Sequence, residues 1–137
     1  MAVLLVDRDG RVLLQLRDEH APVGPGRWST VGGAVEPGER PADAAERELT
    51  EETSLVAGSL ELWFAGTLPA NAGPGTTAWH VYAAASSATD ADVVVGEGAD
   101  IRFVSPAVVA ELDLLPASRF LVAQFLESST YVRLKRR

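Results

Sequence analysis

The stretch "GGAVEPGERPADAAERELTEETSL", residues 32–55, carries the strongest structural signal in the chain. A loop containing glycine and proline leads into a helix-forming segment that begins at Pro41 and reaches Thr53. Proline is favoured in the first turn of a helix because its missing N–H needs no partner there. Acidic side chains crowd this segment, although like charges three or four residues apart repel one another on a helix. The stretch therefore predicts a loop and a helix whose negative charge is offset by something bound.

The periodicity of residues 41–53 separates an apolar face of the helix from an acidic one. At about 100° per residue, three apolar residues share a narrow sector that we expect to pack on a sheet. These residues are Ala42, Ala45 and Leu49. Glu48, Glu51 and Glu52 share a neighbouring sector roughly 100° wide, so we expect their carboxylates at the rim of the sheet. Their spacing of three and four residues lets them reach a single point.

Three convergent carboxylates without a nitrogen or sulfur ligand make a hard oxygen site, which suits Mg²⁺ or Mn²⁺. Magnesium binds substrate phosphates alongside a few carboxylates, so such a site would let an acidic protein hold a phosphorylated substrate. Glu36 and Glu39, on the loop before the helix, either meet the positive end of the helix dipole or supply further ligands. A competing interpretation is an acidic surface helix on an unrelated scaffold, in which Arg47 simply pairs with Glu51.

Apolar runs and turn residues outline the rest of the chain. The segment from Asp7 to Gly10 separates the first two runs and is a hairpin signal. We expect strands at 1–7, 11–17, 28–33, 60–69, 77–85 and 101–105. We expect helices at 41–53, 106–112 and 116–128, the last with Leu121, Phe125 and Leu126 buried. We interpret 18–27 and 70–75 as loops, and 86–99 as a loop with an edge strand.

Length and composition limit the protein to a few classes. A chain of 137 residues is predicted to form one domain, 1–137, and strands on both sides of a central helix indicate an α+β or α/β fold. The absence of cysteine excludes disulfides and thiolate zinc sites and is compatible with the cytoplasm, where we expect the protein. The net charge of −7 argues against a nucleic-acid partner, because the basic cluster "VRLKRR" (132–137) is interpreted as a solvated end. No apolar run approaches the ~20 residues of a membrane span, so no membrane partner is expected.

The spacing of residues within 33–55 resembles the Nudix box, GX5EX7REUXEEXGU, in which U is a bulky aliphatic residue. The matching positions are Gly33, Glu39, Arg47, Glu48, Leu49, Glu51, Glu52 and Leu55. The one departure is Ser54, which stands where the family has glycine. Because glycine often takes a positive φ just past a helix, serine there costs on the order of 1 kcal/mol and predicts a slightly altered turn.

The resemblance implies a single Nudix hydrolase domain with the Nudix α/β/α sandwich, an α/β fold in which a mixed sheet lies between helices and the box forms a loop–helix–loop. It also implies a pyrophosphohydrolase that depends on Mg²⁺ or Mn²⁺ and cleaves a nucleoside diphosphate linked to another group. We favour a nucleoside triphosphate or a related small nucleotide as the substrate. The alternative is a non-catalytic module that senses a nucleotide through the same fold. A homodimer is kept open as the assembly state.

The resemblance also implies roles for residues of the box. By position, Glu48, Glu51 and Glu52 are the expected metal ligands, one of which orients or deprotonates water. Arg47 is expected to hold the loop and the carboxylates in place rather than touch the substrate. Glu39 is expected to support the site or to act as an auxiliary base.

Two further ligands are expected outside the helix. The Gly33 carbonyl oxygen is one, again by its place in the box. Family members often use one more acidic residue from outside the box, and Glu97 and Asp100, just before the strand at 101–105, are the candidates. Of these two we favour Glu97. For Arg17 we favour a surface charge over a contact with phosphate, and for Trp28 we favour core packing over stacking on a base. His20 and His80 are interpreted as structural.

Overall fold

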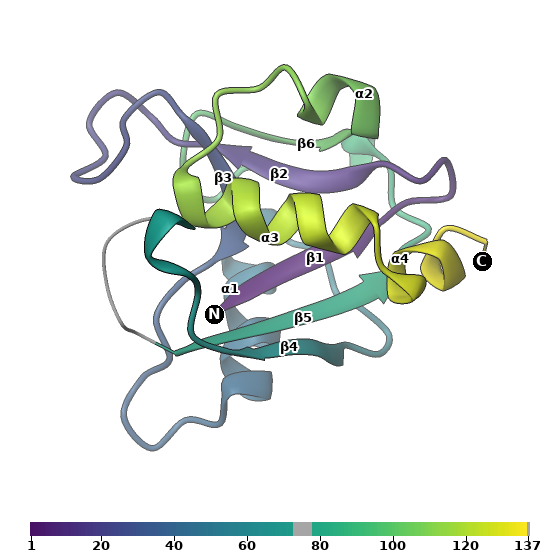
Figure 1. The fold of residues 1–137 in the computed structure, drawn as a ribbon, viewed down its shortest axis with the longest axis horizontal. Coiled ribbons are helices and arrows are strands. Elements are labelled where there is room, and N and C mark those ends of the chain that lie inside the picture. Colours follow the sequence, from purple (N-terminus) through teal and green to yellow (C-terminus); the bar gives the residue numbers. More distant parts are fainter. Residues whose placement is uncertain (73–77, 137) are drawn as a thin grey trace.

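The computed structural model describes residues 1–72 and 78–136, and its centre is a six-stranded mixed sheet (Figure 1). The strands are β1 (Ala2–Val6), β2 (Val12–Leu16), β3 (Trp28–Gly32), β4 (Glu61–Gly66), β5 (Trp79–Ala85) and β6 (Asp100–Val104). Their order across the sheet is β4-β5-β1-β3-β2-β6. β1 and β5 run parallel, whereas the other neighbouring strands pair antiparallel. The predicted mixed sheet is therefore confirmed.

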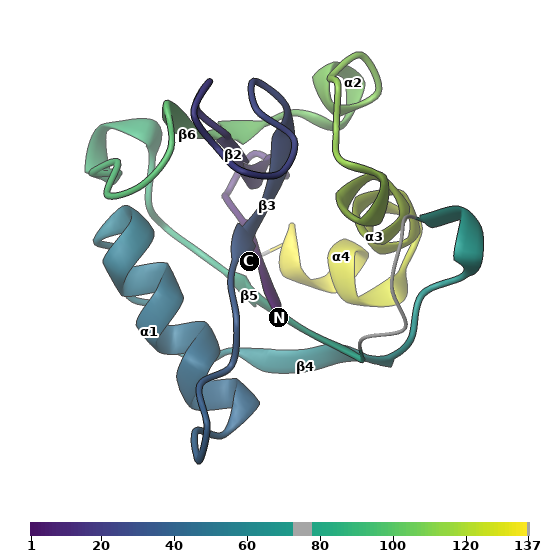
Figure 2. The ribbon, with the colours of Figure 1, turned by 90° about the vertical axis from the view of Figure 1, so that its left-hand side faces the viewer.

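Helices cover both faces of this sheet. α1 (Pro41–Thr53) lies on one face, and α3 (Pro116–Leu126) and α4 (Ser129–Leu134) lie on the other (Figure 2). The remaining helical elements are α2 (Pro106–Val109) and two 3₁₀ turns, η1 (Ala70–Ala72) and η2 (Asp90–Asp92). This arrangement confirms the expected α/β/α sandwich. Within the described residues, no helix combines the length and the apolar character needed to cross a bilayer.

The side chains of β1 enter two hydrophobic cores alternately, because successive residues of a strand point to opposite faces. Leu4 packs in the core beneath α3 with Phe125, which is fully buried. Leu5 packs in the core beneath α1 with Leu49. A strand buried on both faces is a continuous apolar run, which is the pattern of "AVLLV". β1 thus ties the two helical layers together.

β1 and β2 form the predicted hairpin only close to its turn. Their one paired position joins Val6 to Val12. Further along, β3 lies between the two strands, and Val3 of β1 faces Val31 of β3. The turn signal was therefore correct, while the strand pairing beyond it depends on a third strand.

The segment that leads into α3 supplies hydrogen bonds to the end of β3 that β1 does not reach. The Trp28 amide donates to the Asp113 carbonyl, and the Leu115 amide donates to the Trp28 carbonyl, both at 2.9 Å. The Thr30 amide donates to the buried Ser118 hydroxyl at 3.0 Å. This end of β3 is consequently anchored to the α3 layer instead of to β1.

Residues 86–99 form no strand, so the predicted edge strand there is wrong. A capping box made by Thr89 and Asp92 closes the η2 turn. Beyond it, the Val94 amide donates to the Thr53 carbonyl of α1 at 3.0 Å. The backbone of this segment therefore bonds to the end of α1 rather than to an edge of the sheet.

Of the basic cluster expected as a solvated end, the described residues 132–136 are solvated only in part, since Arg133, Lys135 and Arg136 are exposed whereas Leu134 is buried. The cluster begins within α4, whose Tyr131 and Leu134 side chains are buried in the core beneath α3. Arg133 pairs with Glu61 of β4 at 2.7 Å. The amphipathic spacing of a short helix thus outweighs the basic composition of the segment.

Element boundaries differ from the predictions by a few residues. The helix expected at 106–112 ends at Val109, and the helix expected at 116–128 ends at Leu126. Leu126 is only partly buried, whereas the other two residues of the expected stripe in α3 are fully buried. Residue 77 of the strand expected at 77–85, and residues 73–75 of the loop expected at 70–75, lie outside the described residues.

α1 packs on the sheet with a face rotated toward its carboxylates. Ala42, predicted to face the sheet, is exposed. The buried residues of the helix are Ala44, Ala45, Leu49, Glu52 and Thr53. On a helical wheel this stripe is centred between Ala45 and Glu52. Ala42 points in nearly the same direction as Leu49 and Thr53, but it lies in the first turn, before the first buried residue of the helix. A glutamate therefore belongs to the packed face of the helix, not only to its rim.

Ser54 ends α1 in the left-handed conformation, with φ 61° and ψ 11°, and its amide donates to the Thr50 carbonyl at 2.9 Å. Among the described residues, it is the only non-glycine residue with a positive φ. A side chain in this conformation brings Cβ close to the backbone and costs on the order of 1 kcal/mol. The serine thus keeps the turn of the box at the expense of local strain.

We predict that Ser54→Gly leaves the free energy of unfolding about 1 kcal/mol higher than Ser59→Gly does, because both substitutions add freedom to the unfolded chain but only Ser54→Gly relieves strain. Denaturant unfolding monitored by circular dichroism measures the change. Ser59→Gly is the matched control, since Ser59 lies in the same connection without a positive φ. The control is expected to lower stability through the added freedom of the unfolded chain. Equal effects of the two substitutions would contradict the assignment of strain to Ser54.

Candidate active site

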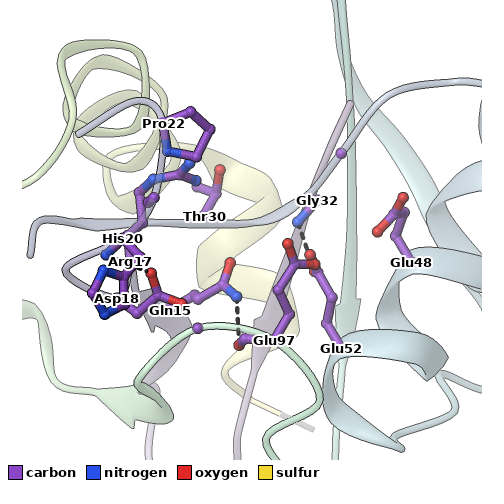
Figure 3. Close-up of a pocket in the computed structure, with 13 residues that line it drawn as sticks. Gln15, Arg17, Asp18, His20, Pro22, Thr30, Gly32, Glu48, Glu52 and Glu97 are labelled. Carbon is purple, nitrogen blue, oxygen red and sulfur yellow. Dashed lines mark hydrogen bonds between the residues drawn. The ribbon is translucent and has the colours of Figure 1, made fainter. Parts of the chain in front are cut away.

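Three glutamates converge beside the sheet. One carboxylate oxygen from each of Glu48, Glu52 and Glu97 lies within 4.8 Å of the others, and Figure 3 shows the three side chains turned toward one another. Glu48 and Glu52 come from successive turns of α1, whereas Glu97 comes from the loop before β6. The spacing of four residues on the helix therefore works as predicted, and a third group arrives from a distant part of the chain.

Glu52 is the most buried member of this cluster, with 3% of its surface exposed. Burial, together with the neighbouring charges of Glu48 and Glu97, raises the pKa of its carboxyl group to about 8. The Gly32 amide donates to Glu52 Oε2 at 3.2 Å and partly opposes this rise in pKa. A carboxylate in this position is stabilised by a cation or by a proton.

The donor set fits a hard divalent cation. Within the described residues, neither Glu52 nor Glu97 pairs with a lysine or arginine side chain, so their negative charge is uncompensated by the chain. Carboxylate oxygens are the ligands that Mg²⁺ and Mn²⁺ prefer. Such a cation would hold all three carboxylates in the charged form and remove their mutual repulsion.

Arg47 pairs with acidic residues of the box, among them Glu39 and Glu48. Its Nε and Nη2 atoms donate to the two oxygens of Glu39 at 2.8 and 3.0 Å, in a bidentate pair. Its Nη1 atom donates to Glu48 Oε1 at 3.0 Å. The bond from Arg47, joined by one from the Glu36 amide, lowers the pKa of Glu39 to about 2. Arg47 thus clamps the loop to α1, while Glu39 stays ionised as its partner.

Gly33 brings the backbone of the loop against Glu48. A Cβ atom at this position would lie 2.7 Å from Glu48 Oε1, closer than carbon and oxygen can pack. The Gly33 carbonyl oxygen accepts a hydrogen bond from the Met1 nitrogen at 2.8 Å. Glycine is therefore required here for the position of the Glu48 carboxylate, whatever its carbonyl binds.

Not all predicted ligands meet in the cluster. Glu51 points away from it, with 60% of its side chain exposed, and accepts a bond from Arg47 Nη1 at 3.3 Å. Asp100, the other candidate outside the box, pairs with Arg102. Glu97, the favoured candidate, occupies the cluster. The geometry thus distinguishes three convergent carboxylates from one that lies apart.

The cluster forms one wall of a cleft of about 440 Å³. Arg17, Asp18 and His20 line the opposite wall, and Gln15 lies between the two walls (Figure 3). Arg17 Nε donates to the Val23 carbonyl at 2.6 Å, which holds the guanidinium group at the cleft. A cleft of this volume suits a small ligand with both metal-bound and cation-bound groups.

Sequence reasoning gave no functional role to several residues that line this cleft. His20, for which the sequence predicts a structural role, lies exposed on the wall of the cleft. Gln15 carried a readable signal, because it is the single polar residue in the strand "VLLQL". Trp28 and His80 do not line the cleft, and Trp28 packs against the core beneath α3. The loop at 18–27 lacks any comparable pattern.

Comparison with known sequences connects these features to one family. The sequence profile of the NUDIX domain matches residues 1–125. Nucleoside triphosphatase NudI of Escherichia fergusonii is 48% identical over 48 residues, which cover 35% of this chain and 34% of that protein. The protein of the same name from Salmonella arizonae is 39% identical over 61 residues, 43% of each chain. The chain thus covers less than half the length of the curated relatives it matches.

Solved structures share the fold over most of the chain. The MutT protein from Methanosarcina mazei Go1 aligns with a TM-score of 0.73 and 22% identity, covering 99% of this chain and 93% of that one. The NUDIX domain of Shewanella oneidensis NrtR, complexed with ADP-ribose, aligns with a TM-score of 0.73 and 20% identity, covering 90% and 82%. At these identities the likeness establishes the architecture.

We predict that Gly33→Ala weakens Mn²⁺ binding about tenfold, because the added methyl group displaces the Glu48 carboxylate. Isothermal titration calorimetry without substrate measures the affinity. Gly58→Ala is the matched control, since a Cβ atom at Gly58 meets nothing within 4 Å. Unchanged affinity in the folded Gly33→Ala protein would show that Glu48 needs no such fit.

We predict that the metal-free protein loses stability as the pH rises from about 4.5 to about 8. The folded state raises the pKa of Glu52 to about 8 from its usual 4.5, so it binds the proton more tightly than the unfolded chain does. Stability therefore falls with pH across this window, where the folded state holds the extra proton. Unfolding by denaturant in the presence of a chelator measures the slope.

Glu52→Gln is expected to flatten this pH dependence, because the amide does not titrate. Equal slopes in the wild type and in Glu52→Gln would refute the assignment to Glu52. Glu39 affects stability over a different pH range. Because its pKa is lowered in the folded state, the stability that it contributes is lost only as the pH falls from 4.5 toward 2.

Proposed function

The chain belongs to the NUDIX family, and we propose that it is a metal-dependent pyrophosphohydrolase that cleaves a nucleoside diphosphate linked to another group. A nucleoside triphosphate or a related small nucleotide is the favoured substrate. The observation that carries the proposal is the convergence of Glu48, Glu52 and Glu97 in a cleft, with Glu52 buried and without a cationic partner among the described residues. A fold with this uncompensated negative charge is suited to bind Mg²⁺ or Mn²⁺.

Some of the proposed metal ligands are supported by the geometry of the structure, and others only by their position in the motif. Glu48, Glu52 and Glu97 are supported by their mutual distances. Glu51 and the Gly33 carbonyl are proposed by their place in the motif alone, since Glu51 lies outside the cluster and points to solvent. A turn of the Glu51 side chain away from Arg47 would be needed to bring it to a cation.

The chemistry follows from charge and protonation. A bound divalent cation would neutralise charge on the phosphate oxygens and make a coordinated water more acidic. A carboxylate of the cluster accepts the proton of the attacking water, and the anhydride P–O bond breaks as the new P–O bond forms. Arg47 and Glu39 position Glu48 and the loop and do not contact the substrate.

Arg17 is proposed to bind the phosphate chain from the opposite wall of the cleft. Its Nε atom is held by the Val23 carbonyl, which leaves the two Nη groups for a ligand. A cation is needed on this side because the chain as a whole carries a charge of −7 and would otherwise repel a nucleotide. The cleft then holds an anion between a metal wall and an arginine wall.

The relatives support this class of substrate. Nucleoside triphosphatase NudI carries the favoured activity in its name, and the NrtR domain was solved with ADP-ribose, a nucleoside diphosphate linked to a sugar. Nucleoside triphosphates and ADP-ribose both contain the pyrophosphate bond that the proposal requires. These two kinds of nucleotide are therefore the substrates to test.

We predict that Glu52→Gln lowers the rate of phosphate or pyrophosphate release at least about 100-fold with either Mg²⁺ or Mn²⁺. The measurement is a release assay across nucleoside triphosphates and ADP-ribose. Glu46→Gln is the matched control, because Glu46 lies exposed on the other side of α1 and is expected to keep full activity. Nucleotide binding without turnover in the wild type would instead favour the non-catalytic sensing module.

A further inference from the structure

Gln15 is a buried polar residue in the middle of the fold. It lies on β2 within the strand "VLLQL", and only 5% of its surface is exposed. Its Nε2 atom donates to the carbonyl oxygen of Glu97 at 2.8 Å, across 82 residues of sequence (Figure 3). A buried amide costs free energy unless it is hydrogen-bonded, so this bond accounts for the presence of Gln15 in an apolar strand.

The backbone around Glu97 has little rigidity of its own, because glycines flank it on both sides. A Cβ atom at Gly96 would lie 2.2 Å from the Glu51 carbonyl oxygen. Gly98 has a φ of +85°, and a Cβ atom there would lie 2.9 Å from Gln15 Nε2. Close packing thus requires both glycines, and glycine peptides rotate more freely than others.

Contacts to two neighbouring elements hold the ends of this turn. The Gly96 amide donates to the Glu52 carbonyl at 2.8 Å, which ties the turn to the end of α1. The Ala99 amide donates to the Leu16 carbonyl at 2.9 Å, which ties it to β2. Between these anchors, Gln15 is the partner of the peptide that joins Glu97 to Gly98 among the described residues.

We propose that Gln15 is a positioning residue that sets the direction of the Glu97 carboxylate by fixing the peptide that follows it. This inference rests on the proposed role of Glu97 as a metal ligand. Gln15 acts through the Glu97 backbone and needs no contact with metal or substrate for this role. Residues that orient a ligand typically contribute tenfold to 100-fold to metal affinity.

A double-mutant cycle on Mn²⁺ affinity, measured by calorimetry without substrate, tests the proposal. Gln15→Met keeps the size of the side chain and removes the donor, whereas Gln15→Asn keeps the donor on a side chain too short to reach. We expect each to weaken Mn²⁺ binding about tenfold in the wild-type background. In the Glu97→Gln background, we expect each to change the affinity by less than about twofold, because there is no carboxylate left to position.

The outcomes separate this inference from the proposed function. If Glu97→Gln does not weaken Mn²⁺ binding, the proposed ligand set fails. If Glu97→Gln weakens binding while the Gln15 variants do not, or weaken it equally in both backgrounds, the positioning role alone is overturned. Tyr131→Phe is the matched control, because it also removes a buried side-chain bond to a turn carbonyl, that of Gly10, and is expected to leave the affinity unchanged.

A measurement on the unaltered Gln15 keeps the test decisive if both Gln15 variants fail to fold. The side-chain amide signals of Gln15 in ¹⁵N NMR spectra are expected to shift when Mg²⁺ is added to the wild type. They are expected to stay in place in Glu97→Gln. Signals that do not move in the wild type, or that move equally in both proteins, would overturn the coupling of Gln15 to Glu97.

Discussion

Burial of the Glu52 carboxylate against the sheet is the constraint on which the rest of the site depends. α1 packs with a stripe that contains this glutamate, and Ala44 and Ala45 in the same stripe are small enough to bring the helix close to the sheet. Gly33 continues this close approach on the loop, where any side chain would strike Glu48. A charge held in such surroundings needs a counter-charge or a proton, so the packing of the helix already prepares a cation site.

Some of the clustered carboxylates are paired with an arginine of the chain, and others are not. On the outer side, Arg47 binds Glu39 in a bidentate pair and also reaches Glu48, so the loop is neutralised by the protein itself. On the inner side, Glu52 and Glu97 have no such partner among the described residues. An arginine in the inner position would compete with the cation that we propose to bind there.

Local spacing explains why part of the site was predictable from the sequence. Residues four apart on a helix must lie on one side of it, which brought Glu48 and Glu52 together as expected. A helical wheel gives the direction of each side chain but not how the helix lies on the sheet, so the exposure of Glu51 and of Ala42 could not be predicted from it. Gln15 meets the Glu97 turn only because β2 pairs with β6, and that register is a property of the tertiary fold.

The turn that carries Glu97 also completes α1. The last carbonyl groups of a helix lack partners within it, and here the amides of Val94 and Gly96 bind those of Thr53 and Glu52. The backbone groups that end α1 therefore also position the turn that carries Glu97, the third carboxylate of the cluster. Because ligand and helix share these bonds, a cation bound between them would stabilise the end of α1 as well as the cluster. If the proposed cation binds, its affinity is therefore coupled to the local folding of this turn.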